Sequence, residues 1–166
     1  MMILLAACGG PPRGGAAPAG PAPVTVTQVL PLDRLYVLEM SGAPPTDTTV
    51  TFASGTARTV IVRHAPPDNN VFVVITLPPD TTAADSLRDS TRITVRPQPG
   101  VYGVAIDCDA PIGRGATITF KYPVHFLAPR DARQRYGSVL AYEQALAVAR
   151  RRDDGRYDLL GSTRPA

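Results

Sequence analysis

The sequence predicts an all-β fold, an antiparallel β-sandwich with one short helix before a C-terminal hairpin. Three observations predict this class. From residue 24 onward, apolar and polar residues alternate with the period of two that places successive side chains on opposite faces of a strand. Turn sequences rich in proline and glycine separate the alternating runs. The chain of 166 residues is 44% hydrophobic, which suffices for one core of ordinary size.

The first eight residues, MMILLAAC, end in a sequence that resembles the lipobox of bacterial lipoproteins. In Leu5-Ala6-Ala7-Cys8 the two small alanines fit a peptidase cleft, and the thiol is the group that accepts a diacylglycerol. The resemblance implies that Cys8 becomes the mature N-terminus and holds the protein to a membrane, because two or more acyl chains give stable anchoring. Gly9 stands where an aspartate in enteric lipoproteins resembles an inner-membrane retention signal. We therefore expect the outer membrane, on its periplasmic or surface face, as the destination.

The apolar run before the cysteine is shorter than a signal peptide, which has about 15 to 30 residues and a basic start. We expect that translation begins upstream of Met1 and that residues 1–8 are the end of a truncated signal peptide. The alternative is a cytoplasmic protein that begins with these residues by chance. Residues 9–23 favour the lipoprotein, because they contain only Gly, Pro, Ala and one Arg and cannot join a core. They predict a flexible tether that reaches about 20 Å as a coil and about 45 Å as extended polyproline.

Residues 24–166 are expected to form the β domain. Residues 116–127 give the clearest alternation, with a mostly aromatic face. Pro123 cannot donate to a sheet, so this strand is expected at a sheet edge or bent at that residue. Residues 71–77, VFVVITL, are apolar on both faces and predict the central strand of the core. Shorter runs predict strands at residues 24–30, 35–40, 48–53, 59–64, 91–96 and 101–107.

Proline-rich turns lie between these runs, at residues 43–45, 66–70, 78–80 and 97–100. A capping box at residues 82–85 predicts one helical turn in the loop of residues 81–90. Pro129 favours the start of a short helix, which Gly137 is expected to end. After this helix, Leu146 and Val148, a turn at residues 153–155 and the segment 157–160 predict a closing hairpin.

The rhythm of strands from Thr91 to Thr163, with the terminal hairpin, resembles the later half of the immunoglobulin-type β-sandwich modules of bacterial surface proteins. The resemblance covers under half of the chain. It implies an immunoglobulin-like fold and no particular function, because such sandwiches serve many unrelated roles.

The second cysteine, Cys108, has no disulfide partner if Cys8 carries a lipid. It shares its strand parity with Val104 and Ile106, so we expect a buried and inert thiol on the apolar face. Asp107 and Asp109 flank it on the opposite face, but two carboxylates alone are too few to predict a metal site. We therefore expect no bound metal.

The charge pattern argues against a nucleic-acid partner. The 17 basic and 14 acidic residues leave a net charge of +3, without the basic stripe of a nucleic-acid binder. The densest basic cluster, residues 150–152, is followed at once by Asp153 and Asp154, which predicts a solvated turn. No run reaches the roughly 18 apolar residues that predict a transmembrane helix.

The motifs of the common enzyme classes are absent from the sequence. The two histidines, His64 and His125, are not spaced as a metal-binding pair, and there is no nucleophile elbow, phosphate-binding loop or dinucleotide-binding turn. We expect both histidines to be solvated, and we expect neither enzymatic activity nor a cofactor. The favoured function is a membrane-anchored module that binds an envelope protein or glycan or has a structural role. An envelope hydrolase and a small-ligand carrier are the alternatives, which need a concave pocket or a cavity between the sheets.

Overall fold

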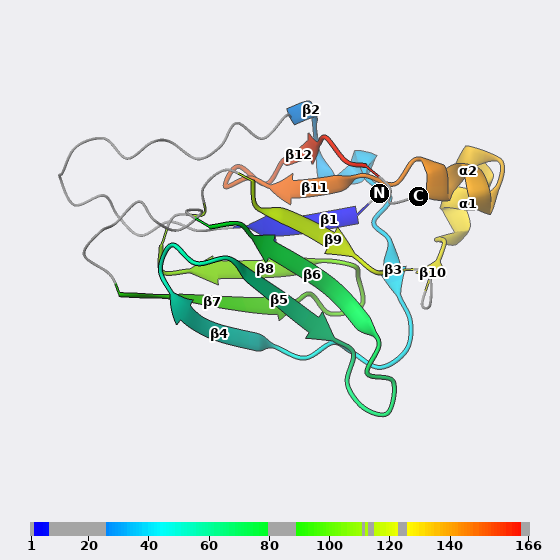
Figure 1. The fold of residues 1–166 in the computed structure, drawn as a ribbon. Coiled ribbons are helices and arrows are strands. Elements are labelled where there is room, and N and C mark those ends of the chain that lie inside the picture. Colours follow the sequence, from blue (N-terminus) through cyan, green and yellow to red (C-terminus); the bar gives the residue numbers. More distant parts are fainter. Residues whose placement is uncertain are drawn as a thin grey trace.

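The computed structural model describes residues 2–6, 26–79, 89–110, 112, 115–122 and 126–163, and most of its elements are antiparallel strands (Figure 1). These strands form three sheets, and two short helices precede the last two strands in the chain. The predicted all-β class is therefore confirmed.

The largest sheet has seven strands in the order β2-β12-β11-β1-β8-β7-β4. Its strands are β1 (Met2–Ala6), β2 (Val26–Leu30), β4 (Thr48–Ala53), β7 (Ser90–Pro97), β8 (Val104–Cys108), β11 (Val148–Arg151) and β12 (Tyr157–Leu160). The second sheet contains β5 (Arg58–Arg63), β6 (Val71–Leu77) and β9 (Thr117–Phe120), and the third pairs β3 (Glu39–Met40) with β10 (Phe126–Leu127). Among the described strands, β1 makes two parallel pairings, with β8 and β11, and every other pairing is antiparallel.

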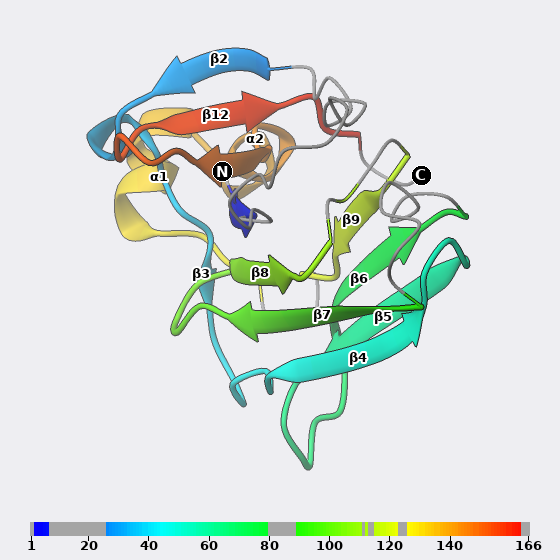
Figure 2. The same ribbon diagram turned by 90° about the vertical axis from the view of Figure 1, so that its left-hand side faces the viewer.

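One core joins the β4-β7-β8 part of the largest sheet to the β5-β6-β9 sheet, and Figure 2 shows these two sets of strands as separate layers. The first layer contributes Phe52, Ile93, Val95, Val104 and Ile106 to the buried cluster, and the second contributes Val60, Val62, Phe72, Val73, Ile75, Leu77 and Phe120. The alternation predicted these inward faces. Because β6 lies between β5 and β9, the prediction that residues 71–77 form a central strand is confirmed.

Phe72 of β6 lies in the middle of this core. Its ring stacks on Tyr102 with 5.4 Å between centroids, and it meets the rings of His64 and Phe120 edge-on at 5.5 and 5.8 Å. Such pairs contribute about 0.5–1.5 kcal/mol each beyond the burial of their area. Burial also raises the pKa of Tyr102 to about 12, and its hydroxyl donates to the carbonyl oxygen of Tyr122 at 3.3 Å. Ring contacts therefore connect the second sheet to the loop that leads into β8.

The residues predicted as one strand at 116–127 form two short strands. β9 pairs with β6 at the edge of the second sheet, whereas β10 pairs with β3. Pro123, the residue expected to cause a break, lies outside the described residues. Because proline has no N–H to donate, a ladder is not expected to continue through that position.

The segment predicted as a strand at residues 35–40 forms a strand only at Glu39–Met40. A 3-10 helix, η1 (Leu32–Arg34), precedes it, and both Leu35 and Leu38 are buried. Leu38 packs in the main core, whereas Leu35 packs in a smaller cluster with Ala149 and Tyr157. The segment therefore connects two clusters of apolar side chains, so its apolar residues do not share one face of a strand. The helical turn predicted at residues 81–90 lies almost entirely outside the described residues.

The helix predicted before the hairpin is α1 (Arg130–Tyr136), and Gly137 ends it with a left-handed φ of 76°. A second helix, α2 (Val139–Gln144), follows where the sequence analysis predicts none. Ser138 explains its start, because the serine hydroxyl accepts the backbone N–H of Ala141 at 3.0 Å and so caps the first turn. The predicted closing hairpin is present as β11 and β12.

Replacing Ile93 by alanine tests the position of the core. Ile93 in β7 is fully buried, whereas Ile61 in β5 is 43% exposed. We expect Ile93→Ala to lower the free energy of unfolding by about 2–5 kcal/mol and Ile61→Ala to lower it by less than about 1 kcal/mol, because the first substitution leaves a cavity. Urea denaturation followed by circular dichroism measures both. Equal losses would contradict the assignment of these two faces.

Candidate binding surface

The outward face of β4, β7 and β8 carries exposed polar side chains in register. On β7, Arg92, Thr94 and Arg96 alternate with inward-facing residues and therefore point away from the core. The strand pairing places Thr94 beside Thr49 on one side and beside Asp107 on the other. We name this surface the polar face, which consists of Thr49, Thr51, Arg92, Thr94, Arg96 and Asp107.

Hydrogen bonds order the polar face without closing it to solvent. The hydroxyls of Thr49 and Thr94 lie 3.0 Å apart, and the guanidinium of Arg96 donates to the carboxylate of Asp107. The hydrogen bond with Asp107 raises the pKa of Arg96. Because about half of each of these two side chains is exposed, their ion pair contributes little to stability. The same exposure leaves donors and acceptors available to a partner.

The residue types of the polar face suit hydrogen-bonded recognition. A guanidinium presents several N–H donors in one plane, and a threonine hydroxyl both donates and accepts. Carboxylates, backbone amides and sugar hydroxyls are the groups that such a surface can bind. The sequence predicts the outward position of these residues, but their alignment across three strands depends on register.

The two aspartates that flank Cys108 are each engaged by arginine residues of β7. Asp107 accepts from Arg96, and Asp109 Oδ1 accepts the backbone N–H of Arg92 at 2.8 Å. The backbone N–H of Asp109 in turn donates to the carbonyl oxygen of Arg92 at 3.1 Å. Asp109 therefore fixes the end of the β7–β8 pairing. In the part of the chain that the structure describes, no group of three or more His, Cys, Asp or Glu side chains is placed to hold a metal ion.

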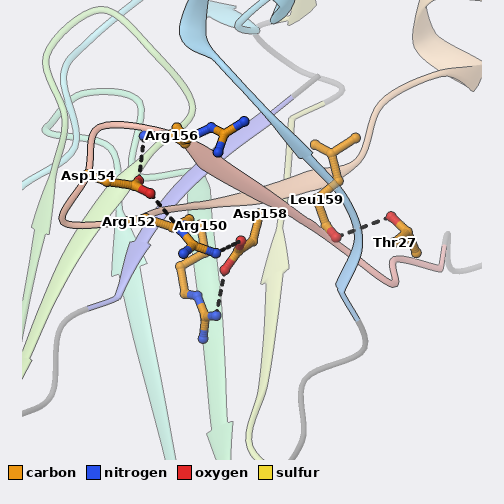
Figure 3. Close-up of polar contacts among 7 residues, drawn as sticks. All are labelled: Thr27, Arg150, Arg152, Asp154, Arg156, Asp158 and Leu159. Carbon is orange, nitrogen blue, oxygen red and sulfur yellow. Dashed lines mark hydrogen bonds and ion pairs between the residues drawn. The ribbon is translucent and has the colours of Figure 1, made fainter.

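The hairpin at residues 148–160 contains a buried carboxylate that the sequence analysis did not identify (Figure 3). The side chain of Asp158 is 3% exposed, and its Oδ2 accepts from Arg150 Nη2 at 2.6 Å. Its Oδ1 accepts from Arg152 Nη1 at 3.2 Å, and Arg152 also pairs with Asp154 at 3.3 Å. The hydrogen bond from Arg150 is the main reason why the pKa of Asp158 is lowered. The prediction of a simple solvated turn was therefore incomplete.

This cluster fixes the shape of the hairpin and joins it to β2. Arg150 lies directly opposite Asp158 in the β11–β12 register. Across the turn, the backbone N–H of Arg152 donates to the carbonyl oxygen of Arg156 at 2.8 Å. The hydroxyl of Thr27 in β2 donates to the carbonyl oxygen of Leu159 at 3.1 Å (Figure 3). The one acidic residue in the strand of residues 157–160, opposite an arginine, is the sequence signal that could have identified the pair.

His64 is buried in the core, which corrects the expectation of a solvated side chain. It continues the inward parity of Val60 and Val62 just after β5 ends. Its Nδ1–H donates to the carbonyl oxygen of Ala43 at 2.6 Å, and its backbone forms an isolated bridge with Pro45. His64 therefore holds the loop before β4 against the end of β5. The other histidine, His125, lies outside the described residues.

Of the two cysteines, Cys8 lies outside the described residues and Cys108 is half-buried. Cys108 packs against the main core, together with the inward-facing Val104 and Ile106 of β8. The predicted parity is correct, but the position at the end of β8 leaves the thiol more exposed than expected.

The Asp158→Asn substitution tests the hairpin cluster. We expect it to lower the free energy of unfolding at pH 7 by about 1.5 kcal/mol, the low end for hydrogen bonds to charged groups, because the side chains of Arg150 and Arg152 are 36% and 46% exposed. The control Asp154→Asn, at an exposed carboxylate, should cost less than about 0.5 kcal/mol.

The pH dependence of this difference follows from the lowered pKa of Asp158. The contribution of the native carboxylate is complete above its ordinary pKa of 3.8 and is lost as the pH falls through the lower native pKa. The stability difference between the native sequence and Asp158→Asn should therefore be constant near neutral pH and vanish in strong acid. Urea titrations at several pH values measure it, and a difference that grows in acid would refute the ion-pair assignment.

In the described residues, no helix combines the length and the apolar character needed to cross a bilayer. Comparison with protein-family models, with curated proteins and with solved structures finds no match.

Proposed function

We propose that this chain is a lipoprotein of the bacterial cell envelope, anchored to a membrane through Cys8, and that its β domain binds an envelope protein or glycan. The lipobox resemblance at residues 5–8 and the tether at residues 9–23 support the anchor. The expected location is the outer membrane. The first described strand after residues 9–23 is β2, which begins at Val26.

The polar face is the observation that carries the binding function. Its arginine and threonine side chains are neighbours because the pairing of β4, β7 and β8 sets which residues lie side by side. A partner that binds there meets Thr94 and Arg96 already hydrogen-bonded to Thr49 and Asp107, so these side chains lose less conformational entropy on binding. The ion pair of Arg96 and Asp107 suits a polar, hydrated interface of the kind that transient protein or glycan complexes have.

The immunoglobulin-like assignment belongs to the same proposal. Two layers that share one core, β4-β7-β8 and β5-β6-β9, support it. The enclosed position of His64 favours the binding module over a hydrolase that uses this histidine, because its ring faces core residues and a backbone carbonyl group. The envelope hydrolase and the small-ligand carrier are tested by the same experiments.

Labelling with palmitate tests the anchor. We expect the gene product, expressed from its upstream in-frame start, to incorporate labelled palmitate, and we expect Cys8→Ser to abolish incorporation because the acceptor thiol is lost. Cys108→Ser is the matched control and should retain the label. Incorporation that survives Cys8→Ser would exclude lipidation at this residue.

Photo-crosslinking from the polar face tests the binding function. A photoreactive amino acid at Thr51 of the membrane-anchored protein should yield a defined protein or glycan adduct in the native envelope, and Arg92→Ala should reduce its yield about tenfold, because a lost hydrogen bond to a charged group costs about 1.5 kcal/mol or more. Arg58→Ala, at an exposed arginine on β5 of the other sheet, is the control and should leave the yield unchanged. Equal adduct yields in all three proteins would exclude the polar face. Turnover of hydrolase substrates that His125→Ala abolishes in a folded protein would instead support the enzyme.

A further inference from the structure

The position of β1 in the largest sheet is unusual, because this strand comes from the segment that the sequence predicts to be the end of a signal peptide. The first half of β1 pairs with β11, placing Ile3 beside Ala149. Its second half pairs with β8, placing Ala6 beside Ile106. β1 therefore fills a strand position between two halves of the sheet, β2-β12-β11 and β8-β7-β4 (Figure 2).

Removal of β1 changes the exposure of both neighbours. We consider lipidation at Cys8 followed by hydrolysis of the Ala7–Cys8 peptide bond. The water molecule is consumed in forming a carboxylate on Ala7 and an amino group on Cys8, and residues 1–7 are released. β8 then keeps only β7 as a described partner, and β11 keeps only β12. The unpaired edges, residues 148–150 of β11 and residues 105–106 of β8, would lie along successive halves of the vacated position. Ala149 and Ile106, which are buried in the complete sheet, would border this gap.

Two unpaired strand edges favour the binding of a further strand. Backbone N–H and C=O groups at an unpaired edge form a template for another strand, and buried apolar residues beside them favour a strand with apolar side chains. The present occupant has that chemistry, since residues 2–6 read MILLA. It also runs parallel to both neighbours, which sets the direction that a replacement must take.

The segment next to the vacated position is not a suitable replacement. Residues 9–23 contain five prolines and no large apolar side chain, and proline does not fit a strand with neighbours on both sides. A second mature copy lacks the same apolar segment. An apolar strand of another protein has the chemistry that the tether lacks.

We infer that the mature lipoprotein has a vacant strand position between β8 and β11, which receives an extended apolar strand of a partner protein, parallel to both neighbours. This inference rests on the proposed lipidation and cleavage at Cys8, and it deepens the proposed function by naming a second site and the form of the segment that binds there. Residues 2–6 occupy the position in this structure, so the site would be released only when cleavage removes them.

Amide hydrogen exchange on two forms of the chain tests the inference. The Cys8→Ser precursor cannot be lipidated and keeps residues 1–7, whereas the mature lipoprotein is extracted in detergent without them. We expect amide exchange at residues 105–106 and 148–150 to be at least about tenfold faster in the mature form, because these edges have lost their partner. The amides of Ile93 and Val95, in a strand paired on both sides, should exchange equally in both forms.

A synthetic peptide tests whether an apolar strand binds at the vacant position. The peptide of residues 1–7, MMILLAA, with two lysines added for solubility, should restore slow exchange at residues 105–106 and 148–150 of the mature protein. The same peptide with Leu4→Pro is the matched control and should not, because proline removes an N–H from the middle of the strand. Equal restoration by both peptides, or none by either, would overturn the inference.

Two other results would overturn it in distinguishable ways. Equal protection in the precursor and the mature form would mean that β8 and β11 pair directly with each other. Protection that rises with protein concentration, together with a dimer in light scattering, would assign the position to a second copy. Palmitate labelling distinguishes a failure of the proposed function from these results, because a chain without palmitate on Cys8 would keep residues 1–7.

Discussion

The ring of Phe72 is the contact on which the two-layer arrangement depends. It stacks on Tyr102, which leads into β8 of one layer, and it touches Phe120 of β9 in the other. It also packs against His64, whose hydrogen bond to Ala43 ties the loop before β4 to the end of β5. This buried ring therefore contacts side chains of its own layer and the loop that leads into β8, while the pairing of β4, β7 and β8 aligns the polar face.

Much of the fold can be predicted from the sequence, because the alternation of side chains is a local property. The strand at Val71–Leu77 is the clearest case, since a strand with apolar residues on both faces is expected in the interior of the fold. Gly137 ends α1 for an equally local reason, its left-handed backbone. The segment at residues 35–40 could not be predicted this way, because Leu35 and Leu38 pack in two clusters formed by parts of the chain distant in sequence.

The polar face, the hairpin cluster and His64 also combine features that alternation predicts with features that depend on strand pairing. Alternation alone places Arg92, Thr94 and Arg96 on an outward face, but the neighbours of Thr94 depend on which residues of β4 and β8 lie opposite. The burial of Asp158 also depends on pairing, because a carboxylate in an apolar strand is tolerated only where arginines reach it. His64 was predictable from its parity with Val60 and Val62; histidine's usual polarity led to the wrong expectation.

The anchor proposed at Cys8 has a mechanical consequence for β2. Force between that anchor and the β domain would reach the described residues first at Val26, and β2 is held to the rest of the sheet by β12 alone among the described strands. When the pull acts along the strand, the ladder between β2 and β12 bears it in shear, with all of its hydrogen bonds loaded together, and the bond from the Thr27 hydroxyl to Leu159 adds resistance at the loaded end. A pull across the strand would open the same bonds one at a time. The angle at which the proposed anchor pulls on the domain would therefore decide how much tension the β2–β12 ladder bears before β2 separates.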